Sequence, residues 1–236
     1  MNSTMPTFKG QFASIVLIGR HNPQILNHDF LVRHDVLPRE SEPFRSLLTD
    51  SGRGPGSGVS PFSEFISTPV ASSIRYGPIA VTVDESRFQI VDHGYFDHPS
   101  STTIVDIIKR YFGKLLIHTP LQIGGVNFNG LVVFRNLEDE WEFDRRIGIS
   151  RPVVQSWAKS PDNLRISSKV SFTREHYAVE FQVAKPKGFT DNGLVNTNYE
   201  HKFHSLDDMM KWVGSIEELY RDFVGVLQSL DVEVMA

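Results

Sequence analysis

Residues 205–230, SLDDMMKWVGSIEELYRDFVGVLQSL, carry the strongest structural pattern in the sequence. Apolar residues recur there in alternating steps of three and four, which is the spacing of one face of an α-helix. Ser205, followed three residues later by Asp208, resembles a capping box with a short acid, so we expect the helix to begin there. The principal apolar positions are Leu206, Met209, Val213, Ile216, Tyr220, Phe223, Leu227 and Leu230.

The apolar stripe of this helix is wide, because it also includes Trp212, Leu219, Val224 and Val226. A two-stranded coiled coil needs only a narrow seam, whereas a wide stripe is typical of a helix that covers a sheet or enters a larger core. We therefore predict a long C-terminal amphipathic helix packed on a sheet. A coiled-coil seam is the alternative.

The segments before this helix alternate between apolar and polar residues, the pattern of half-buried strands. Three such segments follow one another, so we predict an antiparallel meander with one wet face. Their apolar positions are Leu164, Ile166, Val170 and Phe172, then Tyr177, Val179, Phe181 and Val183, then Val195, Thr197, Tyr199, His201 and Phe203.

The first half of the chain shows a similar order of elements. A buried strand is predicted over 14–18, another over 71–76, and a hairpin over 79–90 with its turn at 84–86. A helix is expected over 104–115. We therefore predict an α+β fold with antiparallel sheet built from two pseudo-repeated hairpin-plus-helix halves, about 1–135 and 136–236, in a single compact unit.

Composition narrows the functional classes. The 236 residues are 40% hydrophobic and 22% charged, which is typical of a globular protein. The net charge of −4 provides no overall basic field for nucleic acid, and the absence of cysteine excludes disulfides and Cys-ligated zinc. No apolar run approaches the ~18 residues of a membrane span. We expect a cytoplasmic protein without membrane contact.

The glycine-rich stretch within 50–60 is the first candidate motif. Gly52, Gly54, Gly56 and Gly58 alternate, which matches neither a dinucleotide-binding fingerprint nor a P-loop. No nucleophile elbow is present either. We therefore predict a flexible surface loop and no nucleotide cofactor.

Histidine and acidic clusters offer little for a metal site. His21, His28 and His34 lie near Asp29 and Asp35, but residues 28 and 35 on a helix over 24–37 would lie roughly 10 Å apart. His201 and His204 would point to opposite faces of one strand. The acidic run 138–144 lacks a calcium-loop pattern and is expected to form a helix. Such a charge run is usually a solvated face, and Glu140 or Glu142 facing a basic partner is an alternative. We predict no metal and no other cofactor.

Basic residues do not form a continuous stripe. A folded surface could still assemble one from Arg75, Arg87, Lys169 and Arg174, which occupy predicted wet strand positions. A nucleic-acid-binding component of a nucleoprotein complex is therefore one alternative function. A hydrolase with a site around His21, Asp29 and His34 is another.

Large apolar residues within 38–69 favour a different function. They flank a loop that cannot form a core, and exposed apolar surface of this kind typically marks an interface. The leading hypothesis is a non-enzymatic subunit that binds a protein partner or a second copy of itself. The interface candidates are Phe44, Leu47, Leu48, Phe62, Phe65 and Ile66.

Two short stretches and the C-terminal helix carry a resemblance. They are IVLIGRHNPQIL at 15–26, VNFN at 126–129 and the aromatic residues of 205–230. In these the chain resembles a sporadically distributed family of uncharacterised bacterial proteins of similar length. The resemblance implies a bacterial or phage origin and an accessory role, and it transfers no catalytic residue.

Overall fold

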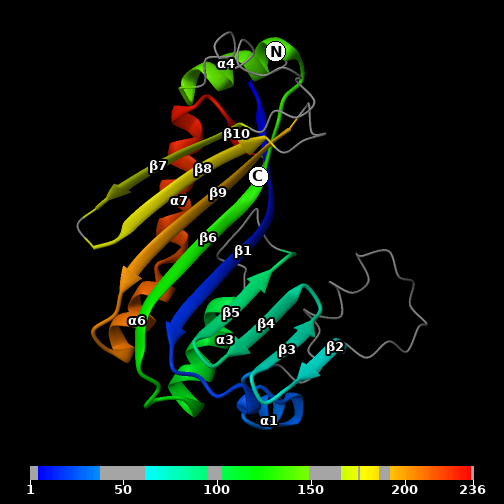
Figure 1. Cartoon of the computed structure of the whole chain (residues 1–236), viewed down its shortest axis with the longest axis vertical. Coiled ribbons are helices and arrows are strands. Elements are labelled where there is room, and N and C mark those ends of the chain that lie inside the picture. The colour runs from blue at the N-terminus through cyan, green and yellow to red at the C-terminus, as the bar shows by residue number, and fades with distance from the viewer. Residues whose placement is uncertain are drawn as a thin grey trace. The chain divides into compact units, whose positions relative to one another are not determined.

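The computed structural model describes residues 5–37, 62–94, 103–148, 166–174, 176–185 and 192–234. These residues form an α+β fold with a large, mainly antiparallel sheet (Figure 1). Its strand order is β2-β3-β4-β5-β1-β6-β9-β8-β7, and β10 pairs in parallel with β1. The strands are β1 (Thr7–Gly19), β2 (Phe62–Ser67), β3 (Ala71–Tyr76), β4 (Ile79–Asp84), β5 (Arg87–Asp92), β6 (Leu121–Val133), β7 (Ile166–Thr173), β8 (Ala178–Lys185), β9 (Asn192–Lys202) and β10 (Glu233–Val234).

The helices are short in the first half of the chain and longer in the second. They are η1 (Pro23–Ile25), α1 (His28–Arg33), α3 (Ile104–Arg110), the π-helical turn η3 (Tyr111–Leu115), α4 (Leu137–Arg146), α6 (Leu206–Gly214) and α7 (Ile216–Ser229). Asparagine side chains cap the N-termini of η1, α1 and α4. Among the described residues no helix has the length and apolar composition that crossing a bilayer requires.

The chain divides into two compact units. The first contains 1–11, 127–199 and 217–236, and the second contains 12–126 and 200–216. Each unit therefore takes residues from both halves of the sequence, and β1, β6 and β9 contribute to both units. The pseudo-repeat of the two halves stays a prediction.

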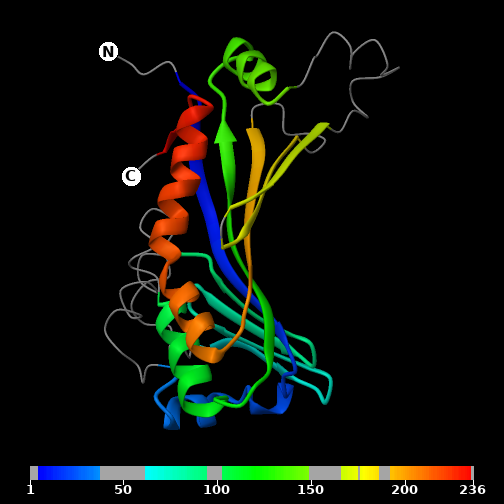
Figure 2. The ribbon, with the colours of Figure 1, turned by 90° about the vertical axis from the view of Figure 1, so that its left-hand side faces the viewer.

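Aromatic residues form the core of the first unit. Phe223 of α7 contacts Phe8 of β1 edge to face at 5.3 Å between ring centroids, and it stacks on Phe128 of β6 at 5.6 Å. Tyr199 of β9 and Tyr220 of α7 also contact Phe128. All five rings are buried, so α7 covers one face of the strands of this unit, as Figure 2 shows.

The core of the second unit forms where its strands meet α3 and η3. Phe88 of β5 contacts Tyr111 and Phe112, and Ile15 and Leu17 of β1 are fully buried. The register of β4 and β5 pairs Val81 with Ile90 and Val83 with Phe88. The predicted hairpin over 79–90 is thus confirmed, with its turn held by Asp84, which accepts hydrogen bonds from Ser86.

The C-terminal helix differs from the prediction because it is divided in two. Ser205 caps α6 by accepting a hydrogen bond from the backbone N–H of Asp208 at 3.1 Å, as the capping pattern predicts. The helix ends at Gly214, and Ser215 donates its hydroxyl to the carbonyl of Trp212 at 2.7 Å. Gly-Ser pairs are common sites of helix breaks. The apolar spacing continues across the break, so periodicity alone did not indicate it.

Other element boundaries also differ. The first strand extends from Thr7 to Gly19, beyond the predicted 14–18, and η1 and α1 replace the single helix over 24–37. The helix over 104–115 ends in the π-helical turn η3. The glycine-rich stretch within 50–60 lies outside the described residues, so its flexibility stays a prediction.

We expect Phe223→Ala to lower the free energy of unfolding by about 3–5 kcal/mol, because the substitution leaves a cavity among buried rings. Denaturant unfolding of the purified chain measures this loss. Gln228→Ala, at an exposed position of the same helix, is the matched control and should change the free energy by less than about 0.5 kcal/mol. A loss below about 1 kcal/mol for Phe223→Ala would contradict the described core.

Candidate functional site

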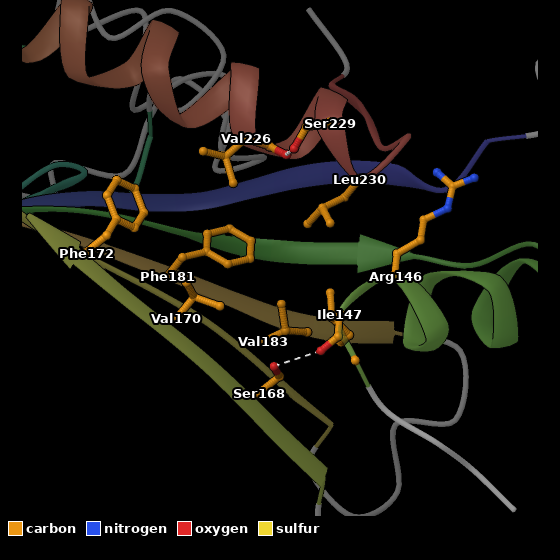
Figure 3. Close-up of a pocket in the computed structure, with 11 residues that line it drawn as sticks. Arg146, Ile147, Ser168, Val170, Phe172, Phe181, Val183, Val226, Ser229 and Leu230 are labelled. Atoms are coloured by element: carbon orange, nitrogen blue, oxygen red, sulfur yellow. Dashed lines mark hydrogen bonds between the residues drawn. The ribbon is translucent and has the colours of Figure 1, made fainter. Parts of the chain in front are cut away.

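A groove of about 380 Å³ lies in the first unit, between the β7–β8 hairpin and the C-terminal part of α7 (Figure 3). Pockets of some 300–1,000 Å³ commonly hold small ligands or the side chains of a partner. In Figure 2 the hairpin diverges from α7, which accounts for the unfilled space. We call this space the groove, and its walls come from β7, β8, α7 and the end of α4.

The hairpin forms the first wall. Its register pairs Val170 with Phe181 and Phe172 with Val179, so apolar side chains of both strands share one face. Polar residues occupy the other face, where Lys169 pairs with Glu180 at 2.6 Å. Phe181 is only 6% exposed, whereas Val170 is 53% exposed. The groove is therefore deepest at β8 and open towards β7.

The C-terminal part of α7 forms the second wall through Val226 and Leu230. The backbone N–H of Val232 donates to the carbonyl of Leu227 at 3.0 Å, and Asp231 takes a left-handed conformation with φ of 52°. Aspartate tolerates this conformation better than most residues do. The left-handed residue ends the helix and turns the chain back into β10.

The end of α4 closes the third side through Arg146, Ile147 and Gly148. Gly148 ends the helix with φ of 78°, the left-handed conformation that favours glycine after a helix. The hydroxyl of Ser168 on β7 donates to the carbonyl of Ile147 at 3.0 Å. This hydrogen bond, drawn in Figure 3, ties the outer strand of the hairpin to the end of α4.

A buried charge cluster positions α4 against the hairpin. The Nζ atom of Lys185, at the end of β8, lies 2.8 Å from Oε1 of Glu140 and 2.5 Å from Oδ1 of Asp144. The same ammonium lies 5.0 Å from the ring centroid of Phe134. The acidic face of α4 is thus directed partly into the protein. Glu140 thus contacts a basic residue of its own chain, and the alternative that it or Glu142 faces a basic partner stays a prediction.

We expect Lys185→Met to lower the free energy of unfolding by about 3–5 kcal/mol, because it removes the ammonium that contacts two buried carboxylates. Urea unfolding checks this. Adding Asp144→Asn to Lys185→Met should restore part of the loss, since one buried negative charge is then removed as well. Equal stability of the wild type and Lys185→Met would show that the cluster does not hold α4.

The described arginine side chains around the groove form ion pairs with carboxylates. Arg146 pairs with Asp231, and its Nε atom lies 3.1 Å from Oε1 of Glu142. At the other end, Arg174 lies 2.8 Å from Oδ1 of Asp222 on α7. Tyr199 donates its hydroxyl to the other oxygen of Asp222 at 3.0 Å. The pair at one end therefore joins α4 to the turn after α7, and the pair at the other end joins the residue after β7 to α7.

These pairs also shift the pKa of two neighbouring groups, Glu142 and Tyr199. Hydrogen bonds from Arg145 and Arg146 lower the pKa of Glu142. Burial, together with the charge of Asp222, raises the pKa of Tyr199, so that this hydroxyl stays protonated and donates to the carboxylate. The rim of the groove carries balanced charge.

The predicted site residues fall in different places. Phe44, Leu47 and Leu48 lie outside the described residues. Phe62 and Phe65 belong to β2, but their side chains are not described, while Ile66 on the same strand is 60% exposed. Ile66 on β2 and Val170 on β7, both more than half exposed, lie on the strands at the two ends of the strand order.

The four residues considered for nucleic acid are divided between the units. Arg75 and Arg87 are exposed in the second unit, and Lys169 and Arg174 belong to the first. Lys169 and Arg174 are ion-paired with carboxylates. Although burial opposes the shift, hydrogen bonds from Ser86, and to a smaller extent Arg87, lower the pKa of the Asp84 carboxyl. These contacts compete with phosphate binding. The nucleic-acid function stays a prediction.

The histidines are also separated. His21 is buried between Phe88 and Phe112 and lies 3.2 Å from the carbonyl of Leu17, whereas His34 contacts Phe30. His201 stacks on Trp212 and approaches Asp208 at 3.4 Å. In the part of the chain that the structure describes, no group of three or more His, Asp or Glu side chains could hold a metal ion. The hydrolase function stays a prediction.

Burial lowers the pKa of His21 below 6.5, although the Leu17 carbonyl and Asp84 oppose this shift. The folded state therefore binds fewer protons than the unfolded state just below this pH, so stability is complete above about pH 6.5 and falls as the pH decreases. We expect His21→Gln to show a shallower loss of unfolding free energy between pH 7 and pH 5. His93→Gln is the parallel variant, since burial and Arg75 also lower the pKa of His93. An unchanged slope in His21→Gln would refute the assignment.

Sequence reasoning did not identify the groove. Alternation correctly indicated which side chains of β7 and β8 share a face, but it assigned that whole face to the core. The exposure of Val170 depends on how far the hairpin diverges from α7, which no local pattern encodes. No protein-family model and no curated protein matches the sequence.

Proposed function

We propose that this protein acts without catalysis of its own, by binding a protein partner or a second copy of itself, and that the groove receives an apolar part of the bound protein. The observation that carries the proposal is an apolar face that remains open. The side chain of Val170 points into the groove beside Phe172 and Phe181, yet Val170 is 53% exposed to solvent. Exposed apolar surface that borders a cavity commonly marks an interface.

The energy available at this site is adequate for recognition. Each large apolar side chain that a partner buries in the groove contributes about 1.5–3 kcal/mol. A factor of ten in affinity corresponds to about 1.4 kcal/mol. Two such side chains would therefore change the affinity by roughly two to four orders of magnitude. The resemblance to uncharacterised bacterial proteins implies an accessory role in a bacterium or phage, and we include that role in the proposal.

We expect Val170→Asp to weaken binding of the partner by at least about tenfold, because it places a charge at the open side of an apolar groove. Ser171→Asp, on the polar face of the same strand, is the matched control. Affinity capture with wild type and both variants identifies proteins that are lost only with Val170→Asp. Light scattering then shows whether the bound protein is a second copy.

Folding of the variants must be compared first. Because Val170 is exposed, we expect Val170→Asp to unfold within about 1 kcal/mol of the wild type. Proteins that bind the wild type and Val170→Asp equally do not use the groove. If neither a partner nor self-association depends on Val170, the proposed function is wrong.

A further inference from the structure

We infer that the bound segment is an extended, uncharged stretch of polypeptide that joins the sheet beside β7 as an additional strand. Its alternate side chains would fill the groove. This inference rests on the function proposed above and adds the chemistry and conformation of the occupant. It draws on the hydrogen-bonding edge of β7, the direction of its side chains and the charge around the groove.

In the part of the chain that the structure describes, no strand pairs with the outer edge of β7. β7 ends the strand order, and among the described residues its ladder partner is β8. The outer side of such a strand presents backbone N–H and C=O groups along its length, which serve as a template for another strand. Over eight residues this edge extends for about 26 Å. Its exposed side chains are Ser167, Lys169, Val170, Ser171 and Thr173.

The direction of the β7 side chains places a new strand over the groove. Ser168, Val170 and Phe172 point to the groove, and their pairs on β8 are Val183, Phe181 and Val179. The exposed fraction rises from 6% at Phe181 on β8 to 53% at Val170 on β7. The apolar face of the hairpin is therefore uncovered along its β7 side. A strand paired with β7 at about 4.8 Å would add a third row of inward side chains there. That row would complete the apolar face opposite Val226 and Leu230.

The charges around the groove favour a neutral occupant. The described lysine and arginine residues of its rim and outer strand are ion-paired, Arg146 with Asp231, Arg174 with Asp222, and Lys169 with Glu180. The hydroxyls of Ser168 and Ser229 donate to backbone carbonyls. An acidic or basic segment would have to break these pairs or lose solvation without compensation. Uncharged apolar side chains at alternate positions meet no such cost.

Selection from a peptide library tests the sequence pattern. A displayed library of random 12-residue peptides is selected on the full-length protein, and peptides that also bind Val170→Asp are removed. We expect the remaining sequences to show apolar residues at every second position and few charges. Apolar residues at steps of three and four would indicate a helix in the groove and would overturn the inference.

Backbone methylation tests strand pairing directly. In one selected peptide each amide in turn is replaced by its N-methyl form, which removes the hydrogen-bond donor. We expect affinity to fall at least about tenfold at alternate positions and to change little at the positions between, because a strand directs successive N–H groups to opposite sides. Losses without a two-residue period would refute strand addition.

The two proposals can fail separately. If selected peptides lose binding with Val170→Asp and keep it with Ser171→Asp, the groove binds polypeptide whatever the methylation pattern shows. If that dependence is found without the two-residue period, strand addition alone is wrong. If no peptide remains once those that bind Val170→Asp are removed, both the groove function and the strand inference are overturned.

Discussion

The contact between Phe223 and the strand residues Phe8 and Phe128 holds the first unit together. It joins α7 to β1 and β6, which are distant from it in sequence. Once α7 is held there, Val226 and Leu230 are placed one turn and about two turns further along the helix. Their position opposite the hairpin therefore follows from the aromatic core and requires no direct contact with β7.

The hairpin is held at its ends and is open along part of its length. Arg174 joins its turn region to Asp222, Ser168 joins β7 to the end of α4, and Lys185 joins β8 to two carboxylates of α4. The partly exposed ion pair of Arg174 with Asp222 contributes little to stability, about 0–1 kcal/mol, whereas the Lys185 cluster is buried and its carboxylates depend on the ammonium. All three contacts share a geometric effect, since they hold the walls of the groove while the apolar surface between those walls stays uncovered.

Local patterns predicted much of the fold. Alternation identified β4, β5, β7, β8 and β9, and the three-and-four spacing identified the apolar positions of α6 and α7. The break at Ser215 was missed because the apolar spacing continues through it. The contacts of Arg146 with Asp231 and of Lys185 with Glu140 join residues far apart in sequence, and charge patterns do not encode such pairs. The groove depends on the same long-range arrangement.

The strict alternation of β7 and β8 limits how this region can change its length. An insertion of one residue within β8 would turn Phe181 and Val183 outward and bring Glu180 and Gln182 towards α7. An insertion of two residues would leave every later side chain on its original face of the sheet. Length variation among descendants of this gene should therefore occur in pairs of codons within the hairpin strands.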